Sequence, residues 1–273
     1  MGRVNRQISI GFAGAGRVGT TMSYWMGQTG WHIKALFDID NDSARQAARS
    51  VPTGVFTSLE MLASRCDCLI LSLPDSAIVD ACDRISEMRN PRVSHIIHTS
   101  GVLPSSVLLA AGREFTTASM HPVMSIPPLD RKHNPFKGVI FGIEGRGRAS
   151  GLARNIVSTL GGRAVDILPE AKPLYHAACS LSGNNTFAVF QTALEMFEAS
   201  GMDSHTAKKM VRGLVTTALD NWMEKGMAGL TGPLKRGDSS TIMEHRVAAS
   251  QDDLWSGLYQ SLFDNLAKQM EER

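Results

Sequence analysis

A segment beyond the middle of the chain, YHAACSLSGNN, places polar side chains among small residues. His176, Ser180 and Asn184 follow one another at intervals of four. On one continuous helix, positions four apart drift by only about 40°, so all three would share a narrow face. A histidine, with an unperturbed pKa of about 6.5, can deliver a proton. An amide can donate a hydrogen bond to a developing alkoxide.

This spacing predicts His176 as a proton donor and Asn184 as the group that polarises the same oxygen, with Ser180 orienting either of them. A purely structural interpretation stays open. In it, His176 is a buried helix histidine bonded to a backbone carbonyl, and Asn184 contacts a preceding domain. The choice depends on what the rest of the chain places beside this helix.

The first of those neighbours is a glycine-rich turn. The sequence GAGRVG follows an apolar run and carries Gly14, Gly16 and Gly19, with Arg17 and Val18 between the last two. Following a strand and opening a helix, this spacing is typical of a dinucleotide-binding turn. Gly14 permits the tight turn, Gly16 lets the backbone approach a pyrophosphate, and Gly19 allows close packing of helix on strand. Three turn glycines without a ligand are the alternative.

Further cofactor contacts are expected where later strands end. Asp38, in LFDID, lies about twenty residues past the last glycine, where a carboxylate accepts hydrogen bonds from the ribose of NAD and repels the extra phosphate of NADP. We therefore expect NAD or NADP, with NAD favoured. Ligands of open α/β sheets bind outside the carboxyl ends of the strands. The segments that leave two further strands should line the nicotinamide side: Leu73, Pro74 and Asp75, and Ser100 and Gly101.

Alternating strand and helix patterns run through residues 1–168. Seven runs look like strands: ISIGFAG, HIKALFD, CLILSLP, SHIIHTS, TTASMHPV, VIFGIEG and AVDIL. The helix candidates between them are RVGTTMSYWMGQ, DSARQAARS, DSAIVDACDRISEM and ASGLARNIVSTL. Alternation of this kind predicts an α/β fold with a doubly wound parallel sheet. Residues 169–273 show helical periodicity only, and predict helices at about 173–199, 203–225, 239–250 and 252–271.

Composition narrows the class of protein. The chain has 273 residues, 43% hydrophobic and 20% charged, with a formal charge of +2. These values are those of a globular protein, and dispersed basic residues make nucleic acid a poor partner. No run approaches the roughly 18 apolar residues of a membrane span, so we expect a cytoplasmic protein that does not bind membranes. The four cysteines are expected to be reduced and, without a second ligand pair at zinc spacing, to hold no metal.

Two other histidines compete for a role. His121 leaves a strand in MHPV and is expected to bind substrate. Asp238, Thr241 and His245 fall on one helical face if their segment is a helix, and Arg236 just before it could hold a substrate carboxylate through two parallel hydrogen bonds. The alternative is that Asp238 caps the helix and Arg236 is solvated. Arg236, Asp238 and His245 could also reach the active-site cleft of a partner subunit.

Together, several segments resemble the short-subunit dehydrogenase-like oxidoreductases. They are, in order, GAGRVG, LSLPD, HTSG, SMHPV, YHAACSLSGNN and LTGPLKRGD, the last followed by His245. The resemblance covers nearly the whole chain and implies a Rossmann-like NAD(P)-binding domain, here residues 1–168. It also implies a helical substrate and dimerisation domain, residues 169–273, similar to the carboxyl-terminal domain of 6-phosphogluconate dehydrogenase. Redox chemistry in a cleft between the domains, and often a dimer, are further implications.

The layout is more distantly similar to ketopantoate reductases, 6-phosphogluconate dehydrogenase-type enzymes and deazaflavin-dependent NADP oxidoreductases. Ketopantoate reductases place a lysine early in the first helix after the Rossmann domain and an asparagine four residues later. Here Lys172 is followed four residues later by His176, with Asn184 eight beyond. A lysine mechanism therefore cannot simply be transferred to this chain.

We expect a dimeric NAD(P)-dependent dehydrogenase or reductase acting on a CH–OH or C=N group. Its substrate would be a small 2-oxo acid or a related carbonyl or imine, carrying a carboxylate. The alternatives are ketopantoate reduction specifically, or a non-catalytic dinucleotide-binding sensor or regulatory protein.

Overall fold

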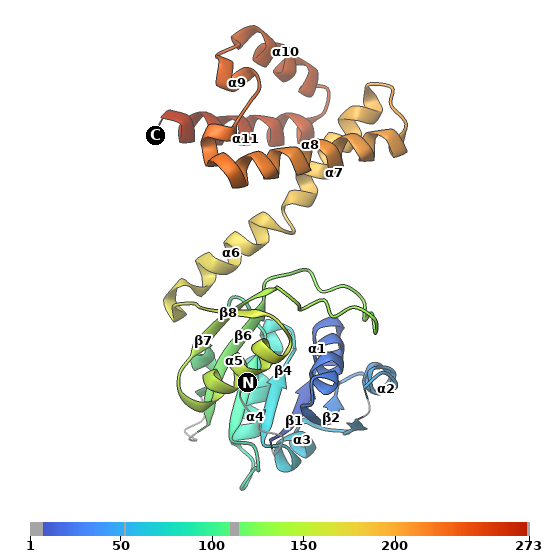
Figure 1. Cartoon of the computed structure of the whole chain (residues 1–273), viewed down its shortest axis with the longest axis vertical. Coiled ribbons are helices and arrows are strands. Elements are labelled where there is room, and N and C mark those ends of the chain that lie inside the picture. Colours follow the sequence, from blue (N-terminus) through green and yellow to red (C-terminus); the bar gives the residue numbers. More distant parts are fainter. Residues whose placement is uncertain (1–7, 52, 110–114, 272–273) are drawn as a thin grey trace. The chain divides into compact units, whose positions relative to one another are not determined.

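The computed structural model describes residues 8–51, 53–109 and 115–271. The chain divides into two compact units, Met1–Ser180 and Leu181–Arg273. The first contains a sheet flanked by helices and the second is helical (Figure 1). An α/β unit followed by a helical region confirms the predicted fold class. The domain boundary predicted between residues 168 and 169 stays a prediction.

The sheet of the first unit has eight strands in the order β3-β2-β1-β4-β5-β6-β7-β8. Their bounds are β1 Ser9–Ala13, β2 His32–Phe37, β3 Gly54–Val55, β4 Cys68–Leu71, β5 His95–His98, β6 Thr116–Pro122, β7 Ile140–Gly145 and β8 Arg163–Asp166. The order of the first six is that of a doubly wound dinucleotide-binding fold. The carboxyl ends of β1, β4, β5 and β6 therefore lie next to one another at one edge of the sheet.

The prediction that the sheet is parallel throughout is wrong at one pair of strands. All neighbouring strands pair in parallel except β6 and β7, which are antiparallel. No helix stands between β6 and β7 in the chain, and a parallel pair needs a crossover that is usually helical. The antiparallel pairing brings His121 on β6 opposite Gly142 on β7.

Helices cover both faces of the sheet, because alternate strand residues point to opposite sides. Ile10, Phe12 and Ile70 pack with α1 Arg17–Gln28, α2 Asn41–Ala48 and α5 Gly147–Thr159. Leu69 and Leu71 pack on the other side with α3 Leu59–Arg65 and α4 Asp75–Ser86. The central strands β1 and β4 are thus buried on both faces, as expected for a parallel sheet with helices on both sides.

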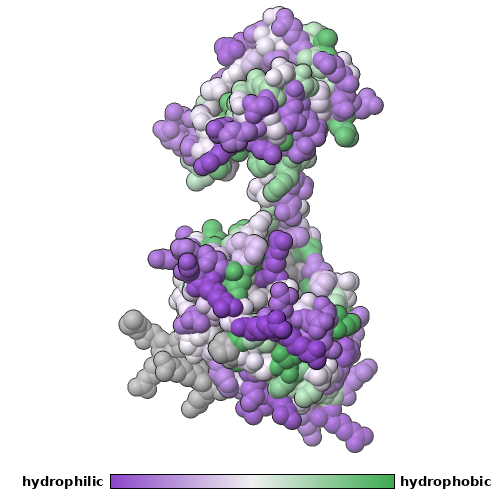
Figure 2. Space-filling view, turned by 90° about the vertical axis from the view of Figure 1, so that its right-hand side faces the viewer, coloured by the Kyte–Doolittle hydropathy of each residue, from purple (hydrophilic) through white to green (hydrophobic). Residues whose placement is uncertain are grey.

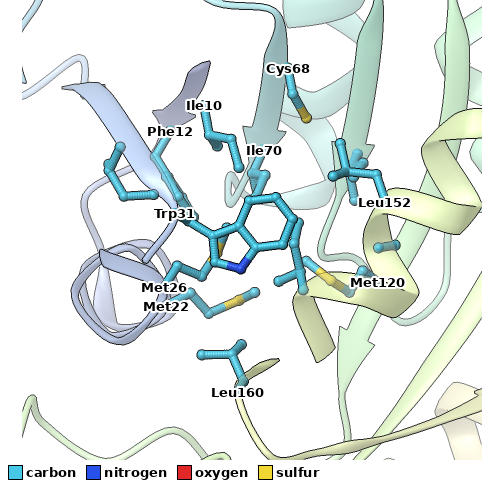
Figure 3. Packing of buried hydrophobic residues seen from close by; sticks show 14 of the residues in the cluster. Ile10, Phe12, Met22, Met26, Trp31, Cys68, Ile70, Met120, Leu152 and Leu160 are labelled. Carbon is cyan, nitrogen blue, oxygen red and sulfur yellow. The ribbon is translucent and has the colours of Figure 1, made fainter. Parts of the chain in front are cut away.

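Large side chains fill the first of these cores. Trp31 lies against Met22 and Met26 of α1 and faces the strand residues Ile10 and Phe12 (Figure 3). The indole nitrogen of Trp31 donates a hydrogen bond of 2.8 Å to the hydroxyl of Thr159 at the end of α5. This bond satisfies the only polar atom of a nearly buried indole, so packing is gained without an unpaired donor.

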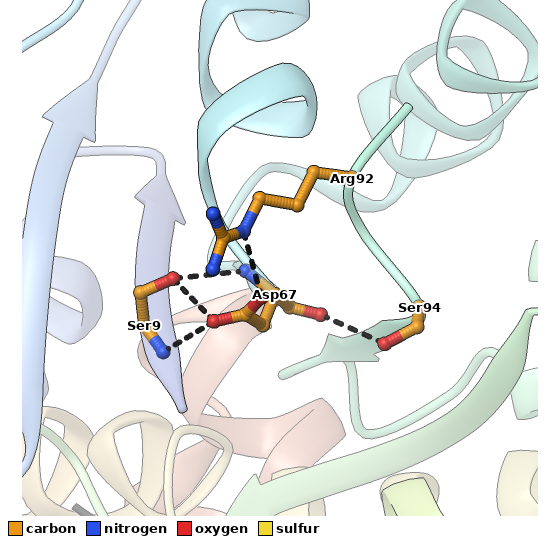
Figure 4. Close-up of polar contacts among 4 residues, drawn as sticks. All are labelled: Ser9, Asp67, Arg92 and Ser94. Carbon is orange, nitrogen blue, oxygen red and sulfur yellow. Dashed lines mark hydrogen bonds and ion pairs between the residues drawn. The ribbon is translucent and has the colours of Figure 1, made fainter. Parts of the chain in front are cut away.

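Asp67 holds the amino-terminal ends of three neighbouring strands together (Figure 4). Its Oδ2 accepts from the Ser9 amide at 2.8 Å and the Ser9 hydroxyl at 2.6 Å, and its Oδ1 accepts from Arg92 Nε at 2.8 Å. Its carbonyl accepts from the Ser94 hydroxyl. Partial burial would raise the pKa of Asp67, but the bonds from Arg92 and Ser9 outweigh it and lower the pKa to about 2.

In the described residues, three short 3-10 helices lie between the main elements, the first of them between β5 and β6, and one α-helix crosses the division between the two units. The 3-10 helices are Ser105–Leu109, Pro169–Ala171 and Gly226–Gly229, and the crossing helix is α6 Lys172–Ser182. The helical unit then contains α7 Thr186–Ala199, α8 Ser204–Lys225, α9 Pro233–Arg236, α10 Ser239–Ala249 and α11 Asp253–Glu271. No helix in residues 8–51, 53–109 and 115–271 is long and apolar enough to span a bilayer.

The single helix predicted over 173–199 is wrong, because it is two helices. A turn at residues 183–185 separates α6 from α7. Gly183 and two asparagines occupy it, and these residue types are poor helix formers that favour turns. Asn184 consequently does not continue the face of α6 that carries His176 and Ser180, so the predicted three-residue stripe ends at Ser180.

Candidate functional site

The glycine-rich turn joins β1 to α1. Gly14 has φ +99°, and a Cβ there would collide with the carbonyl oxygen of Ser72. A Cβ at Gly19 would collide with the Gly14 carbonyl. Gly16 is different, since a Cβ at this position would meet nothing within 4 Å. Two of the glycines are therefore needed for packing, and the third leaves open space at the start of a helix.

That helix start is suited to an anion. Gly16 precedes α1, which has no side chain capping its amino terminus. The first turn of a helix offers unpaired N–H groups and a positive dipole end, which together favour phosphate. The structure therefore fits the dinucleotide pyrophosphate that the spacing of the glycines predicts.

Two clefts meet at Gly16. One, of about 740 Å³, includes Gly14, Gly16, Asp38, Leu73 and Pro74 among its lining residues. The other, of about 300 Å³, is bordered by Arg17 and by Leu129 from the long β6–β7 loop. Six residues predicted to bind a cofactor thus line the two clefts. Ile39, Thr57 and Arg84 also line the larger cleft and were not predicted.

Asp38 braces the glycine turn. Its Oδ2 accepts from the amide of Ala15 at 2.7 Å, and its Oδ1 accepts from the amide of Asp40 at 3.0 Å. Each carboxylate oxygen has a further lone pair, so these bonds do not exclude the predicted ribose contact. Asp38 joins the end of β2 to the turn after β1, where it also borders the larger cleft.

A second cluster lies at the carboxyl ends of β5 and β6, around a buried lysine. Lys172, the first residue of α6, is 1% exposed. Its Nζ donates to the Ser119 hydroxyl at 2.6 Å and to the Ser100 carbonyl at 3.2 Å, while the Ser119 hydroxyl donates to that same carbonyl at 3.1 Å. Burial lowers the pKa of Lys172 to about 8, although Glu144 and Asp75 act in the opposite direction.

Ser100 makes hydrogen bonds within the turn that follows β5. Its amide donates to His98 Nδ1 at 3.2 Å, and its hydroxyl accepts from the amides of Val102 and Leu103. The side chain is buried. The predicted contact of Ser100 with a cofactor stays a prediction, and the structure gives this hydroxyl a local partner on the turn.

His121 is held by a tyrosine from α6. The hydroxyl of Tyr175 lies 2.8 Å from His121 Nδ1, and the rings meet edge to face with centroids 5.7 Å apart. Burial lowers the pKa of His121 to about 4, helped by His176 and Lys172. Burial likewise raises the pKa of Tyr175. Both groups are therefore uncharged near neutral pH.

His176 shares a space with His121. The two imidazole centroids are 5.7 Å apart, and His176 is half-buried. A Cβ at Gly101 would lie 2.9 Å from His121 Nε2 and would collide with His176 Cδ2. Gly101 therefore borders both imidazoles, and a half-exposed imidazole beside this turn could hand a proton to a molecule placed there.

Other predicted residues belong to the helical unit. Asn184 and Arg236 are exposed there, and His245 Nδ1 lies 3.0 Å from the hydroxyl of Tyr259. Asp238 caps α10, since its carboxylate accepts from the amide and hydroxyl of Thr241. Asp238 therefore takes the capping position that the sequence left open as the alternative, while Thr241 and His245 lie within α10. The roles of Asp238 and His245 in substrate binding stay predictions.

The cluster at the carboxyl ends of β5 and β6 also contains four residues that were not predicted from the sequence: Lys172, Ser119, Tyr175 and His98. The resemblance to ketopantoate reductases draws attention to Lys172, but the burial of this lysine depends on strands far away in the chain. In residues 8–51, 53–109 and 115–271, no three His, Cys, Asp or Glu side chains gather closely enough to hold a metal ion. Cys66, Cys68 and Cys82 are free and buried, and burial raises the pKa of Cys66 to about 12.

The strand order and glycine turn define a Rossmann-like unit. Consistent with this, residues 2–122 match the model of a family described as Rossmann-like domain. Residues 139–268 match a family described as domain of unknown function DUF2520. A search of curated protein sequences found no significant match.

Solved structures share this fold over nearly the whole chain. A Bacteroides fragilis protein with the provisional description NADP oxidoreductase is 22% identical, with a TM-score of 0.78, and the match covers 96% of this chain and 99% of that one. A Thermotoga maritima protein named without an activity is 22% identical, with a TM-score of 0.74 and coverage of 97% and 100%. The reductive aminase of Aspergillus terreus, solved with NADPH and ethyl-5-oxohexanoate, is 13% identical, with a TM-score of 0.70 and coverage of 96% and 94%.

Proposed function

We propose that this protein is an NAD(P)-dependent oxidoreductase that reduces a small 2-oxo acid or a related carbonyl or imine. The observation that carries the proposal is the open position of Gly16 at an uncapped helix start, bordered by two clefts. The descriptions of the Bacteroides and Aspergillus structures, and the resemblance to short-subunit dehydrogenase-like oxidoreductases, support it. NAD is proposed ahead of NADP because Asp38 borders the larger cleft.

In this proposal the residues of the chain handle the proton and the orientation of substrate. A bound reduced nicotinamide supplies the hydride. His176 delivers a proton to the oxygen or nitrogen that becomes electron-rich, and His121 binds the substrate beside it. Asn184 as the polarising group and Arg236 as the carboxylate anchor stay proposals from the sequence alone, since both residues belong to the helical unit. On the same basis, Ser180 is proposed to orient His176 or Asn184, Val18 and Asp75 to contact the cofactor, and His245 to bind substrate.

Gly16 offers a direct test of the cofactor. A Cβ at Gly16 meets nothing within 4 Å, so Gly16→Val should fold and lose no more than the roughly 1 kcal/mol of unfolding free energy by which valine is the poorer residue at a helix N-cap. The added methyl groups would stand where the pyrophosphate approaches the backbone, so the affinity for NADH and NADPH, measured by fluorescence titration, should fall at least tenfold (about 1.4 kcal/mol). A folded variant that binds both cofactors as well as the wild type would contradict the proposed site.

We also propose that the protein acts in the cytoplasm as a homodimer. The helical unit carries many large apolar side chains at its surface (Figure 2). Among its described residues only Ala207 and Ala249 are buried. Leu219, Trp222 and Met223 of α8 are more than half exposed. Burying one large apolar side chain contributes about 1.5–3 kcal/mol of stabilising free energy. Helices with this many exposed apolar side chains are therefore stabilised when they pack against the same helices of a second copy.

We propose that the second copy binds at a groove between α7 and α8. It has a volume of about 660 Å³ and is bordered by Phe187, Phe190, Leu194, Val211 and Val215, with charged residues at its edge. Light scattering on the purified protein should give twice the mass of one chain. Phe190→Glu should shift the protein toward monomer, whereas a wild-type protein that is monomeric at micromolar concentration would contradict the dimer.

A further inference from the structure

We propose that Tyr175 is a positioning residue that fixes His121 in the tautomer protonated at Nε2, so that this N–H donates a hydrogen bond to the substrate's reacting oxygen or nitrogen. The part concerning substrate rests on the function proposed above. The part concerning the tautomer rests only on the geometry of the first unit.

Tyr175 lies over β7 at a position where the strand carries glycine. His121 on β6 pairs with Gly142 on β7. A Cβ at Gly142 would lie 2.5 Å from the hydroxyl oxygen of Tyr175 and 2.9 Å from its Cζ. Glycine at this position therefore lets the phenol ring of α6 lie across the strand, and the hydroxyl then reaches His121 Nδ1 at 2.8 Å.

The protonation of Tyr175 and His121 favours a hydrogen bond in which the phenol donates to Nδ1. Burial, together with Cys179, raises the pKa of Tyr175, so the hydroxyl keeps its proton. The Cys179 thiol is a second hydrogen-bond partner of this hydroxyl and can donate to its oxygen, which leaves the phenol proton for His121 Nδ1. Burial, together with His176 and Lys172, lowers the pKa of His121 to about 4 against the opposing effect of Asp75. A neutral imidazole has one N–H and one acceptor nitrogen. When Nδ1 accepts from the phenol, the proton must be on Nε2.

The Nε2–H of His121 faces the turn that follows β5. A Cβ at Gly101 would lie 2.9 Å from His121 Nε2, so Nε2 faces the turn after β5. The ring of His176 borders the same glycine, and the centroids of the His121 and His176 imidazoles are 5.7 Å apart. The two histidines thus face one space from two sides. A neutral imidazole there can polarise an oxygen by donating a hydrogen bond, while His176 supplies the proton.

The pair can be tested without any substrate. In protein labelled with ¹⁵N-histidine, two-bond ¹H–¹⁵N correlation spectra distinguish the two tautomers of each ring, and His121→Asn identifies the His121 signals. The wild type should show an unprotonated Nδ1 and a protonated Nε2 for His121 at pH 7. In Tyr175→Phe that preference should be lost, giving averaged nitrogen shifts. Turnover should fall about tenfold or more in this variant, since His121 no longer presents one fixed donor.

The chain provides a matched control. Tyr259 contacts His245 Nδ1 at 3.0 Å in the helical unit, with ring centroids 5.9 Å apart. Tyr259→Phe removes the same oxygen from a similar pair, and should alter the His245 signals while leaving those of His121 unchanged.

The outcomes separate the two proposals. A wild-type His121 protonated at Nδ1, or a His121 spectrum that is the same in Tyr175→Phe, overturns the inference whatever the activity. If Tyr175→Phe does not fold, the wild-type spectrum alone decides. Should the tautomer be as stated while no carbonyl or imine is turned over, the positioning role of Tyr175 stands and the proposed reaction fails.

Discussion

The ammonium nitrogen of Lys172 lies 2.6 Å from the hydroxyl oxygen of Ser119, in a position where the lysine is 1% exposed. This bond joins the first turn of α6 to β6, and the bond from the same nitrogen to the Ser100 carbonyl joins it to the turn after β5. Tyr175 and His176 follow within one turn of the helix. The lysine therefore sets where both of these side chains meet Gly101 and His121.

Replacement of this lysine should change the pH dependence of stability. The pKa of Lys172 is lowered from 10.5 to about 8 in the folded protein. Between these values the unfolded chain binds more protons than the folded one, so the unfolding free energy contributed by this group rises with pH. In Lys172→Met that rise should be absent. Urea denaturation of both proteins at pH 7.5 to 10 measures it, and parallel curves would show that the lysine is not desolvated as described.

The buried His98 and the half-buried His121 predict a loss of stability in mild acid. Burial lowers the pKa of both His98 and His121 from 6.5 to about 4. As pH falls through this window, the unfolded chain takes up protons first, so the unfolding free energy falls, by roughly 1 to 3 kcal/mol for each histidine. His121→Phe should remove about half of the fall. A variant whose stability still declines as steeply as that of the wild type would contradict the neutral state of His121.

Gly142 should tolerate no side chain. A Cβ there would press on the Tyr175 hydroxyl at 2.5 Å, so Gly142→Ala should destabilise the protein by about 1–3 kcal/mol, the usual cost of overpacking. Gly151 of α5 is the control, since it is exposed and a Cβ there meets nothing within 4 Å. Gly151→Ala should be neutral or stabilising by up to about 1 kcal/mol. Thermal unfolding compares them, and equal melting temperatures would argue against the packing of Tyr175.

The parts of the site that depend on local chain geometry could be predicted from the sequence. The spacing of Gly14, Gly16 and Gly19 fixes a turn and a helix start within six residues, and the structure has both. Pro74 and Leu73 could be placed because strand ends in a parallel sheet meet at one edge. In contrast, the burial of Lys172 results from contacts 53 and 72 residues away, which no local pattern contains.

The polar stripe illustrates the limit of periodicity. Intervals of four predict a common face only while one helix continues, and the turn at residues 183–185 ends it before Asn184. Similarly, Asp238 fits helical spacing with Thr241 but precedes α10, where its carboxylate satisfies the Thr241 amide. Side chains that compete with the helix for backbone hydrogen bonds are favoured at such termini. His176 kept its predicted helix and gained a neighbour, His121, that spacing alone could not supply.

The proposed function requires that the protein reduce a carbonyl or imine with a nicotinamide cofactor and a proton from His176. The most direct measurement is oxidation of NADH and NADPH against a panel of 2-oxo acids, ketopantoate and cyclic imines, run in parallel for the wild type and His176→Ala. We expect turnover of at least one 2-oxo acid or imine by the wild type, and a loss of about a hundredfold or more in the variant with cofactor affinity nearly unchanged. Cofactor binding without turnover of any substrate, or equal turnover by His176→Ala, would contradict the account.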